Sequence, residues 1–148
     1  MNESNLMQRA FELALLQNGR TGKNPSVGCV IQDRDGRTIA EAATGDGGEI
    51  HAEELALLKL ATDRSAGGTA YVTLEPCHRR SHGGLSCSER LIKAGIARVV
   101  VSVRDEHPQG RGGIDRLKRA GVTVETGVME EIGAKLYADF FAQHEKEF

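Results

Sequence analysis

The stretch that decides the fold is 98–104, Arg-Val-Val-Val-Ser-Val-Arg, which is short and dominated by valine. Such a run predicts a buried β-strand. A similar run at 69–75 (TAYVTLE) predicts a second strand. Between them, Ser86 and Glu89 have the S-x-x-E spacing of a helix capping box, and Gly95 ends the helical pattern. A strand–helix–strand unit of this kind predicts parallel strands joined by a right-handed crossover.

The same reasoning extends outward in both directions. The predicted order is a helix at 5–18, strands at 27–32 and 38–43, a helix from His51 to about Thr62, the 69–104 unit, a helix near 113–120, a strand at 122–126 and a helix near 129–144. The early hairpin predicts an antiparallel edge. We therefore expect a three-layer α/β/α sandwich around a mixed five-stranded sheet, with residues 1–148 forming one domain. The helix that starts at His51 is apolar nearly all round, so it is predicted to be enclosed in the core.

Composition narrows the class of protein. The chain has 148 residues, a net charge of −2 and a pI of about 6.2, which argues against a broad surface for nucleic acid. The N-terminus lacks the pattern of a secretory signal, and no apolar run approaches the length of a membrane span. We expect a cytoplasmic protein without a membrane partner. Three cysteines, an odd number, argue against a disulfide framework and leave metal binding or burial.

Four residues carry the predicted chemistry: His51, Glu53, Cys77 and Cys87. One imidazole and two thiolates suit zinc and leave a fourth position for water, as in catalytic zinc sites. Zinc lowers the pKa of that water to about 7, and Glu53 is placed to shuttle its proton. His51 and Cys87 are predicted at helix starts and Cys77 just past a strand end, so the three can meet at one edge of the sheet.

The pattern H-A-E, P-C and a later Cys is similar to that of the zinc nucleobase deaminases, whose signature is H-x-E followed by P-C-x-x-C. Here nine residues separate Cys77 from Cys87. This longer gap resembles the deaminase domain of the bifunctional riboflavin-biosynthesis enzyme. Four further segments resemble that family: 24–30 (NPSVGCV), 94–103 (AGIARVVVSV), the 108–113 loop and 117–122 (LKRAGV).

The resemblance implies a cytidine-deaminase-like fold, with zinc bound by His51, Cys77 and Cys87 and with Glu53 as general acid and base. It also implies that Asn24 contacts the substrate ring. The family's reaction is hydrolytic deamination of a diaminopyrimidinone that carries a phosphorylated ribosylamino group. We expect no reductase domain in this chain, and a homodimer or higher homo-oligomer.

The chain departs from the family around the expected substrate. Thr44 stands where the family usually has a histidine, and the 77–87 loop (CHRRSHGGLSC) is one residue longer than the family's. We predict substrate contacts from Thr44, His78, Arg79 and His82. Arg79 with Arg80 forms a pair that can clasp a phosphate.

Two alternatives remain open at this stage. The changed loops permit a different substrate: a free base, a nucleoside or a precursor of a specialised metabolite. A protein of another class, a non-catalytic zinc-stabilised binding module, would use His78 or His82 as a fourth ligand and close the site. Two other residues have plainer interpretations. Cys29 lies in an apolar strand and is predicted to pack in the core, and Glu75 is predicted to hydrogen-bond local backbone only.

Overall fold

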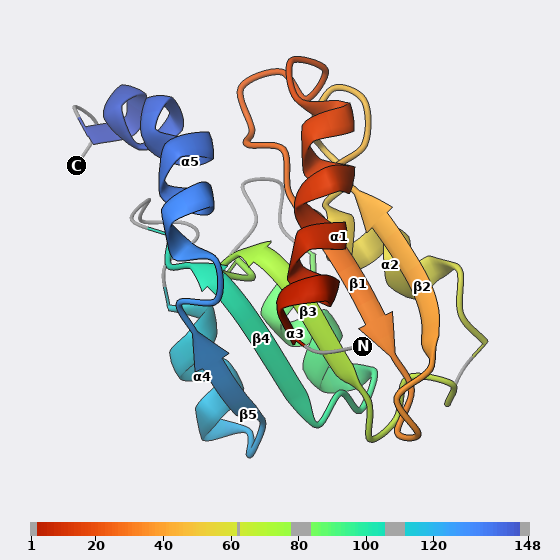
Figure 1. Cartoon of the computed structure of the whole chain (residues 1–148). Helices are drawn as coiled ribbons and strands as arrows, with labels where there is room; N and C mark the ends of the chain where they lie inside the picture. The colour runs from red at the N-terminus through yellow and green to blue at the C-terminus, as the bar shows by residue number, and fades with distance from the viewer. Residues whose placement is uncertain (1–2, 62, 78–83, 106–111, 146–148) are drawn as a thin grey trace.

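A computed structural model describes residues 3–61, 63–77, 84–105 and 112–145. Its elements in chain order are α1 (Glu3–Gln17), β1 (Gly28–Gln32), β2 (Thr38–Ala43), α2 (Ala52–Leu58), β3 (Thr69–Leu74), α3 (Cys87–Lys93), β4 (Arg98–Val103), α4 (Gly113–Arg119), β5 (Thr123–Thr126) and α5 (Glu130–Glu145) (Figure 1). The order and type of all ten elements match the prediction from the sequence.

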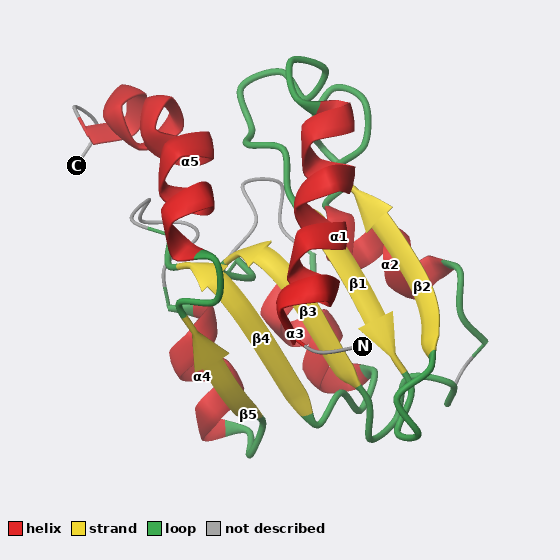
Figure 2. Ribbon diagram, viewed as in Figure 1, coloured by secondary structure: helices red, strands yellow, loops and turns green. Residues whose placement is uncertain are grey.

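The five strands form one mixed sheet in the order β2-β1-β3-β4-β5. Strand β1 is antiparallel to both β2 and β3, whereas β3, β4 and β5 run parallel. Helices α1 and α5 cover one face of the sheet, and α2, α3 and α4 cover the other (Figures 1 and 2). The predicted three-layer sandwich with an antiparallel edge is therefore confirmed. No helix in the described ranges combines the length and hydropathy needed to cross a bilayer.

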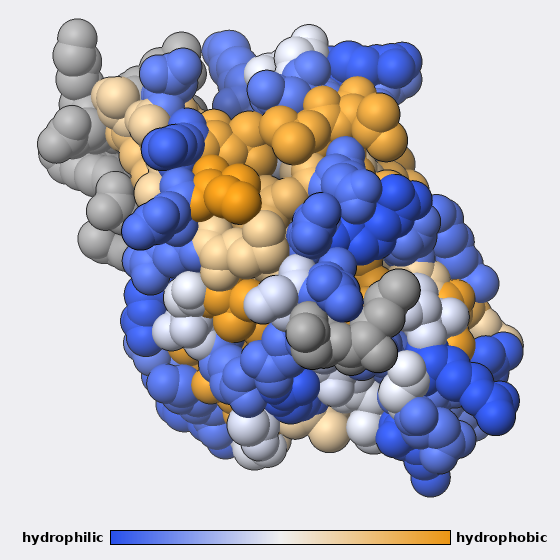
Figure 3. All heavy atoms as spheres, viewed as in Figure 1, coloured by the Kyte–Doolittle hydropathy of each residue, from blue (hydrophilic) through white to orange (hydrophobic). Residues whose placement is uncertain are grey.

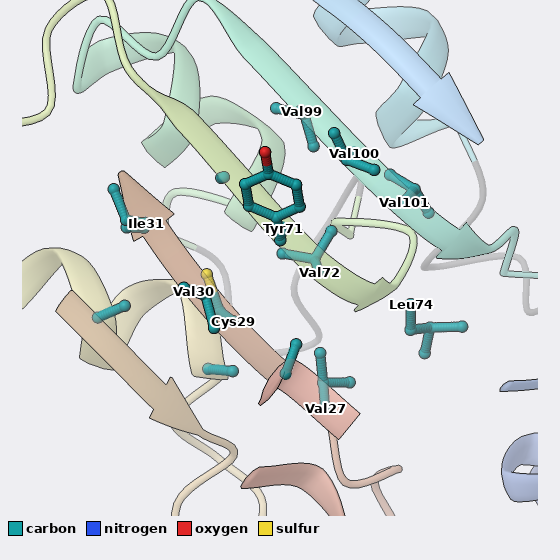
Figure 4. Packing of buried hydrophobic residues seen from close by; sticks show 14 of the residues in the cluster. Val27, Cys29, Val30, Ile31, Tyr71, Val72, Leu74, Val99, Val100 and Val101 are labelled. Carbon is teal, nitrogen blue, oxygen red and sulfur yellow. The ribbon is translucent and has the colours of Figure 1, made fainter. Parts of the chain in front are cut away.

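The core lies on both faces of the three central strands, β1, β3 and β4 (Figure 4). Three valines of β4, Val99, Val100 and Val101, are completely buried. Helix α1 packs on β1 at backbone contact distance, since a Cβ on Gly28 would lie 1.7 Å from the carbonyl oxygen of Ala10. Only glycine fits there, which explains why the short strand GCVIQ begins as it does.

The prediction for the helix after His51 is wrong in two respects. Helix α2 ends at Leu58, because bonds from Lys59 to Ala56 and from Leu60 to Leu57 tighten the last turn. The helix is also not enclosed in the core, since it lies in an outer layer and the Leu58 side chain is 70% exposed. The sequence pattern shows how many residues of a helix are apolar. It does not show how much of the helix surface other elements cover.

Several strands begin or finish at the same end of the sheet, which is called the site edge below. The N-terminal end of β1 and the C-terminal ends of β2 and β3 lie together, because β1 runs antiparallel to both neighbours. The segments that carry Asn24, Thr44 and Cys77 leave the sheet at the site edge. The topology alone therefore gathers three separate pieces of the predicted site in one place.

Tyr137 of α5 joins the C-terminal helix to the site edge. Its ring is 1% exposed, and its hydroxyl donates to the carbonyl oxygen of Ser26 over 2.7 Å. The Thr73 hydroxyl lies 2.6 Å from the tyrosine oxygen and also accepts a 3.1 Å bond from the amide of Gly28. Burial raises the pKa of Tyr137, so the hydroxyl keeps its proton and remains a donor.

We expect Tyr137→Phe to lower the free energy of unfolding by about 1–3 kcal/mol, because the buried carbonyl of Ser26 loses its donor. Denaturant titration of both proteins measures the loss. Tyr71→Phe is the matched control, since the Tyr71 hydroxyl makes a 3.3 Å bond to the side chain of Gln32, which is partly exposed at the end of β1. Equal losses in the two variants would show that the bond to Ser26 contributes no more to the free energy of unfolding than the bond to Gln32.

Candidate metal centre

Three predicted zinc ligands sit at the ends of three elements. His51 is the N-cap residue of α2, with extended backbone angles (φ −79°, ψ 156°), and its imidazole makes no capping bond. Cys77 follows the end of β3, and Cys87 is the first residue of α3. The predicted capping box is present, since Ser86 and Glu89 bond reciprocally through side chain and backbone. The box fixes where α3 begins and hence where the Cys87 side chain starts.

The donor atoms of the three residues lie within 4.8 Å of one another. The Nδ1 atom of His51 is 3.2 Å from the Sγ of Cys87 and 3.6 Å from the Sγ of Cys77. A tetrahedral zinc ion with ordinary bond lengths separates neighbouring N and S donors by about 3.5–3.8 Å. The separation from Cys77 lies in this range and that from Cys87 is 0.3 Å shorter than its lower limit. One nitrogen and two sulfurs are the donors that zinc prefers, so this set suits a zinc ion, with Nδ1 as the histidine ligand.

Groups around Cys77 favour the thiolate form, which is the form that binds a metal. Hydrogen bonds from Cys87 and His51 lower the pKa of Cys77 well below its usual range, against the opposing effect of burial. The backbone amide of Cys87 contributes one of these bonds, donating to the Sγ of Cys77 over 3.2 Å. Cys29 behaves in the opposite way: it is completely buried in β1, and burial raises the pKa of its thiol. The prediction that Cys29 packs in the core is confirmed.

Glu53 lies beside this centre on the first turn of α2 and is 4% exposed. Burial raises the pKa of its carboxyl group to about 7, and Cys77 adds to that shift, whereas His51 and a hydrogen bond with Cys87 oppose it. A carboxyl group with a pKa near neutrality both accepts and releases a proton readily. Residues two apart do not share a face in mid-helix, but His51 precedes the helix, so its ring and the Glu53 carboxylate converge off the helix end.

The predicted substrate contacts have different outcomes. Asn24 is exposed at the site edge, and its amide nitrogen donates to the carbonyl of Gly48 over 2.8 Å. Thr44 is 2% exposed, and its hydroxyl accepts a 2.9 Å bond from the amide of Val27. Thr44 thus holds the backbone after Asn24 and presents little surface to a ligand. His78, Arg79 and His82 lie outside the described residues.

Sequence reasoning missed three residues that surround the cysteines. Ser88 donates from its hydroxyl to the carbonyl of Cys77 over 2.9 Å, and Arg116 lies 3.0 Å from the Ser86 hydroxyl. Glu75 does bond backbone, as predicted, but its partners are remote: the amides of Asp105, Gly112 and Ile114. No local pattern reports a bond between segments 30 to 39 residues apart. The P-C motif that follows Glu75 was the one available signal that this position lies near the site.

Comparison with known proteins agrees with this geometry. Residues 1–103 match the family described as the cytidine and deoxycytidylate deaminase zinc-binding region. The chain belongs to this zinc-binding deaminase family. It is 42% identical, over 95% of both chains, to the diaminohydroxyphosphoribosylamino-pyrimidine deaminase of Buchnera aphidicola from Acyrthosiphon pisum.

Some relatives are longer than this chain. The riboflavin biosynthesis protein RibD of Escherichia coli is 45% identical over 95% of this chain, which spans only 38% of that protein. The solved structure of Acinetobacter baumannii RibD superposes with a TM-score of 0.86 at 40% identity, over 95% of this chain and 39% of the other. The family resemblance and the cytidine-deaminase-like fold expected from the sequence are both confirmed.

Proposed function

We propose that this protein is a zinc-dependent hydrolase that deaminates the diaminohydroxyphosphoribosylaminopyrimidine intermediate of riboflavin biosynthesis. The observation that carries the proposal is the buried Glu53 carboxylate beside three donor atoms within 4.8 Å of one another. The substrate assignment is supported by the 42% identity to a Buchnera deaminase of that name, because the match covers 95% of both chains.

In the proposed reaction water replaces the ring amine, and ammonia leaves. Zinc held by His51, Cys77 and Cys87 would supply Lewis acidity and make water nucleophilic near neutral pH. The Glu53 carboxylate takes one proton from the attacking water and delivers it to the ring nitrogen. It then takes the second proton from the newly attached hydroxyl and delivers it to the amine, which leaves as ammonia while the carbonyl forms. Burial of Glu53 excludes bulk water from this transfer and keeps the proton on the pathway.

Asn24 is proposed as a direct contact to the pyrimidine ring. Its bond to Gly48 fixes the side chain while leaving the residue exposed to a ligand. Thr44 is proposed to act indirectly, through the 25–27 backbone that its hydroxyl holds. We propose that His78, Arg79 and His82 contact the remainder of the substrate, with Arg79 directed to the phosphate.

The test is ammonia release by zinc-loaded protein from the diaminopyrimidinone ribosylamino phosphate. Cytidine, deoxycytidylate, guanine and the dephosphorylated substrate serve as comparison compounds in the same assay. The proposal predicts the highest kcat/KM for the phosphorylated compound. A higher kcat/KM for any comparison compound would retain the deaminase chemistry and replace the substrate.

A homodimer or higher oligomer is proposed as the working form. Figure 3 shows apolar side chains exposed on the face that carries α1 and α5. Leu15 and Leu16 of α1 and Ile132 of α5 are 56%, 72% and 47% exposed. Self-association would remove such a surface from water. Sedimentation velocity measures the state directly, and a monomer at micromolar concentration would contradict the proposal. Cytoplasmic location stays a prediction.

A further inference from the structure

Glu75 is an unusual residue in this structure, because the bonds that its buried carboxylate accepts from the described residues all come from backbone amides. It is 6% exposed, its Oε1 accepts from the amide of Asp105, and its Oε2 accepts from the amides of Gly112 and Ile114. All three distances are 3.0 Å. Gly112 is the N-cap residue of α4 and makes no side-chain cap of its own. Glu75 therefore caps α4 from a distant part of the chain, and its negative charge complements the start of that helix.

Helix α4 is seated directly on the segment that carries Cys77. A Cβ on Gly113 would lie 1.7 Å from the carbonyl oxygen of Pro76, so the helix backbone rests against the residue before the cysteine. Glu75 immediately precedes Pro76 in the chain. The carboxylate and the close backbone contact thus fix α4 against the same short segment from two sides.

Helix α4 also contacts the residues on either side of Cys87 in the chain. Arg116 places its Nη1 atom 3.0 Å from the Ser86 hydroxyl and 3.3 Å from the Glu89 carboxylate, the two members of the α3 capping box. Cys87 lies between them in the chain. Ser88, which follows it, binds the Cys77 carbonyl through both its amide and its hydroxyl, at 3.1 and 2.9 Å. One continuous set of contacts therefore runs from Glu75 through α4 and α3 back to Cys77.

We propose that Glu75 is a positioning residue for the metal centre: it seats α4, and α4 through Arg116 holds the start of α3 at the distance that lets Cys77 and Cys87 bind one ion. The inference rests on the zinc role of these cysteines and not on the identity of the substrate. Groups that orient metal ligands without touching the metal typically contribute about 10- to 100-fold to metal affinity.

The chemistry of the three donors explains why the residue is a carboxylate. Two oxygens face three N–H groups, so every contact needs an acceptor. In Glu75→Gln the new NH₂ group faces either the amide of Asp105 or those of Gly112 and Ile114. The first orientation loses one bond and the second loses two, and in each case an N–H group then faces another N–H group.

The test measures the zinc dissociation constant of the full chain by competition with a chromophoric chelator under native conditions. We expect about 10- to 100-fold weaker zinc binding in Glu75→Gln, together with altered thiolate charge-transfer bands when Co²⁺ replaces zinc. Glu41→Gln is the matched control, because Glu41 of β2 forms a partly exposed ion pair with Arg9 of α1, and the zinc dissociation constant of this variant should stay within about twofold of the parent value. Substrate does not enter the assay, so its outcome is separate from that of the proposed function.

A second variant keeps the inference falsifiable if Glu75→Gln fails to fold. Arg116→Ala removes the link between α4 and the α3 capping box and should weaken zinc binding by about tenfold. In the double variant the two effects should be less than additive, since both act through the placement of α4. The proposal is overturned if Arg116→Ala binds zinc as the parent does. It is also overturned if Glu75→Gln lowers the denaturation midpoint while the zinc dissociation constant is unchanged, because Glu75 would then serve α4 alone.

Discussion

Glu53→Gln retains zinc and loses turnover: we expect kcat to fall by about 10²- to 10⁴-fold. The amide of glutamine has nearly the same shape as the carboxylate but cannot accept and return a proton. Glu53 is 4% exposed, so no solvent base replaces it at that position. Zinc content, measured by atomic spectroscopy, should be unchanged, because the three ligand residues are untouched.

Glu54→Gln provides the control for this prediction. Glu54 is the next residue on the first turn of α2 and pairs with Arg90 over 3.4 Å. Losing this carboxylate removes an equal charge near the same helix end, and kcat should stay within about threefold of the parent value. Full activity in Glu53→Gln, or an equal loss in both variants, would remove Glu53 from the proposed mechanism.

The second large effect is expected at Cys87. Replacing this residue by alanine leaves two donors, and zinc content should fall from about one ion per chain to near none, with loss of turnover. The bound metal also stabilises the fold by mass action, by about 4 kcal/mol when free zinc is 1,000 times its dissociation constant. For a domain of this size that loss lowers Tm by about 8–16 °C. Calorimetry at fixed free zinc measures the shift.

Cys29→Ala separates metal binding from packing in that experiment. Cys29 is completely buried in β1, so its truncation creates a cavity but removes no ligand. It should retain zinc and lose some stability. If Cys87→Ala also retained zinc, the ligand set would be wrong. If chelation unfolds a parent protein that showed no turnover to begin with, the result favours the non-catalytic binding module.

The sequence predicted the features that local chemistry determines. The S-x-x-E spacing placed the start of α3 correctly, because a capping box is formed by residues that are neighbours in the chain. The valine-rich strand β4 and the hairpin of β1 and β2 were likewise readable from short windows. The predicted ligands His51, Cys77 and Cys87 do lie together, since topology brings element ends to the site edge.

What the sequence could not supply depends on packing between distant segments. The exposure of Leu58 follows from the place of α2 in an outer layer, which its own apolar pattern cannot report. The hydroxyl of Thr44, a predicted substrate contact, accepts a bond from the amide of Val27, an arrangement that requires β2 to end beside β1. The backbone partners of Glu75 lie 30 to 39 residues further along the chain.

Because the three ligands lie on three different elements, a bound metal also affects local unfolding of the domain. Chain separations of 26 residues between His51 and Cys77, and of 10 between Cys77 and Cys87, make a bound ion a crosslink that closes two loops. Local unfolding at the start of α2 or of α3 then works against the metal–ligand bonds. Amide hydrogen exchange in both helices should slow together when zinc is added, while β5 at the far edge of the sheet keeps its own rate.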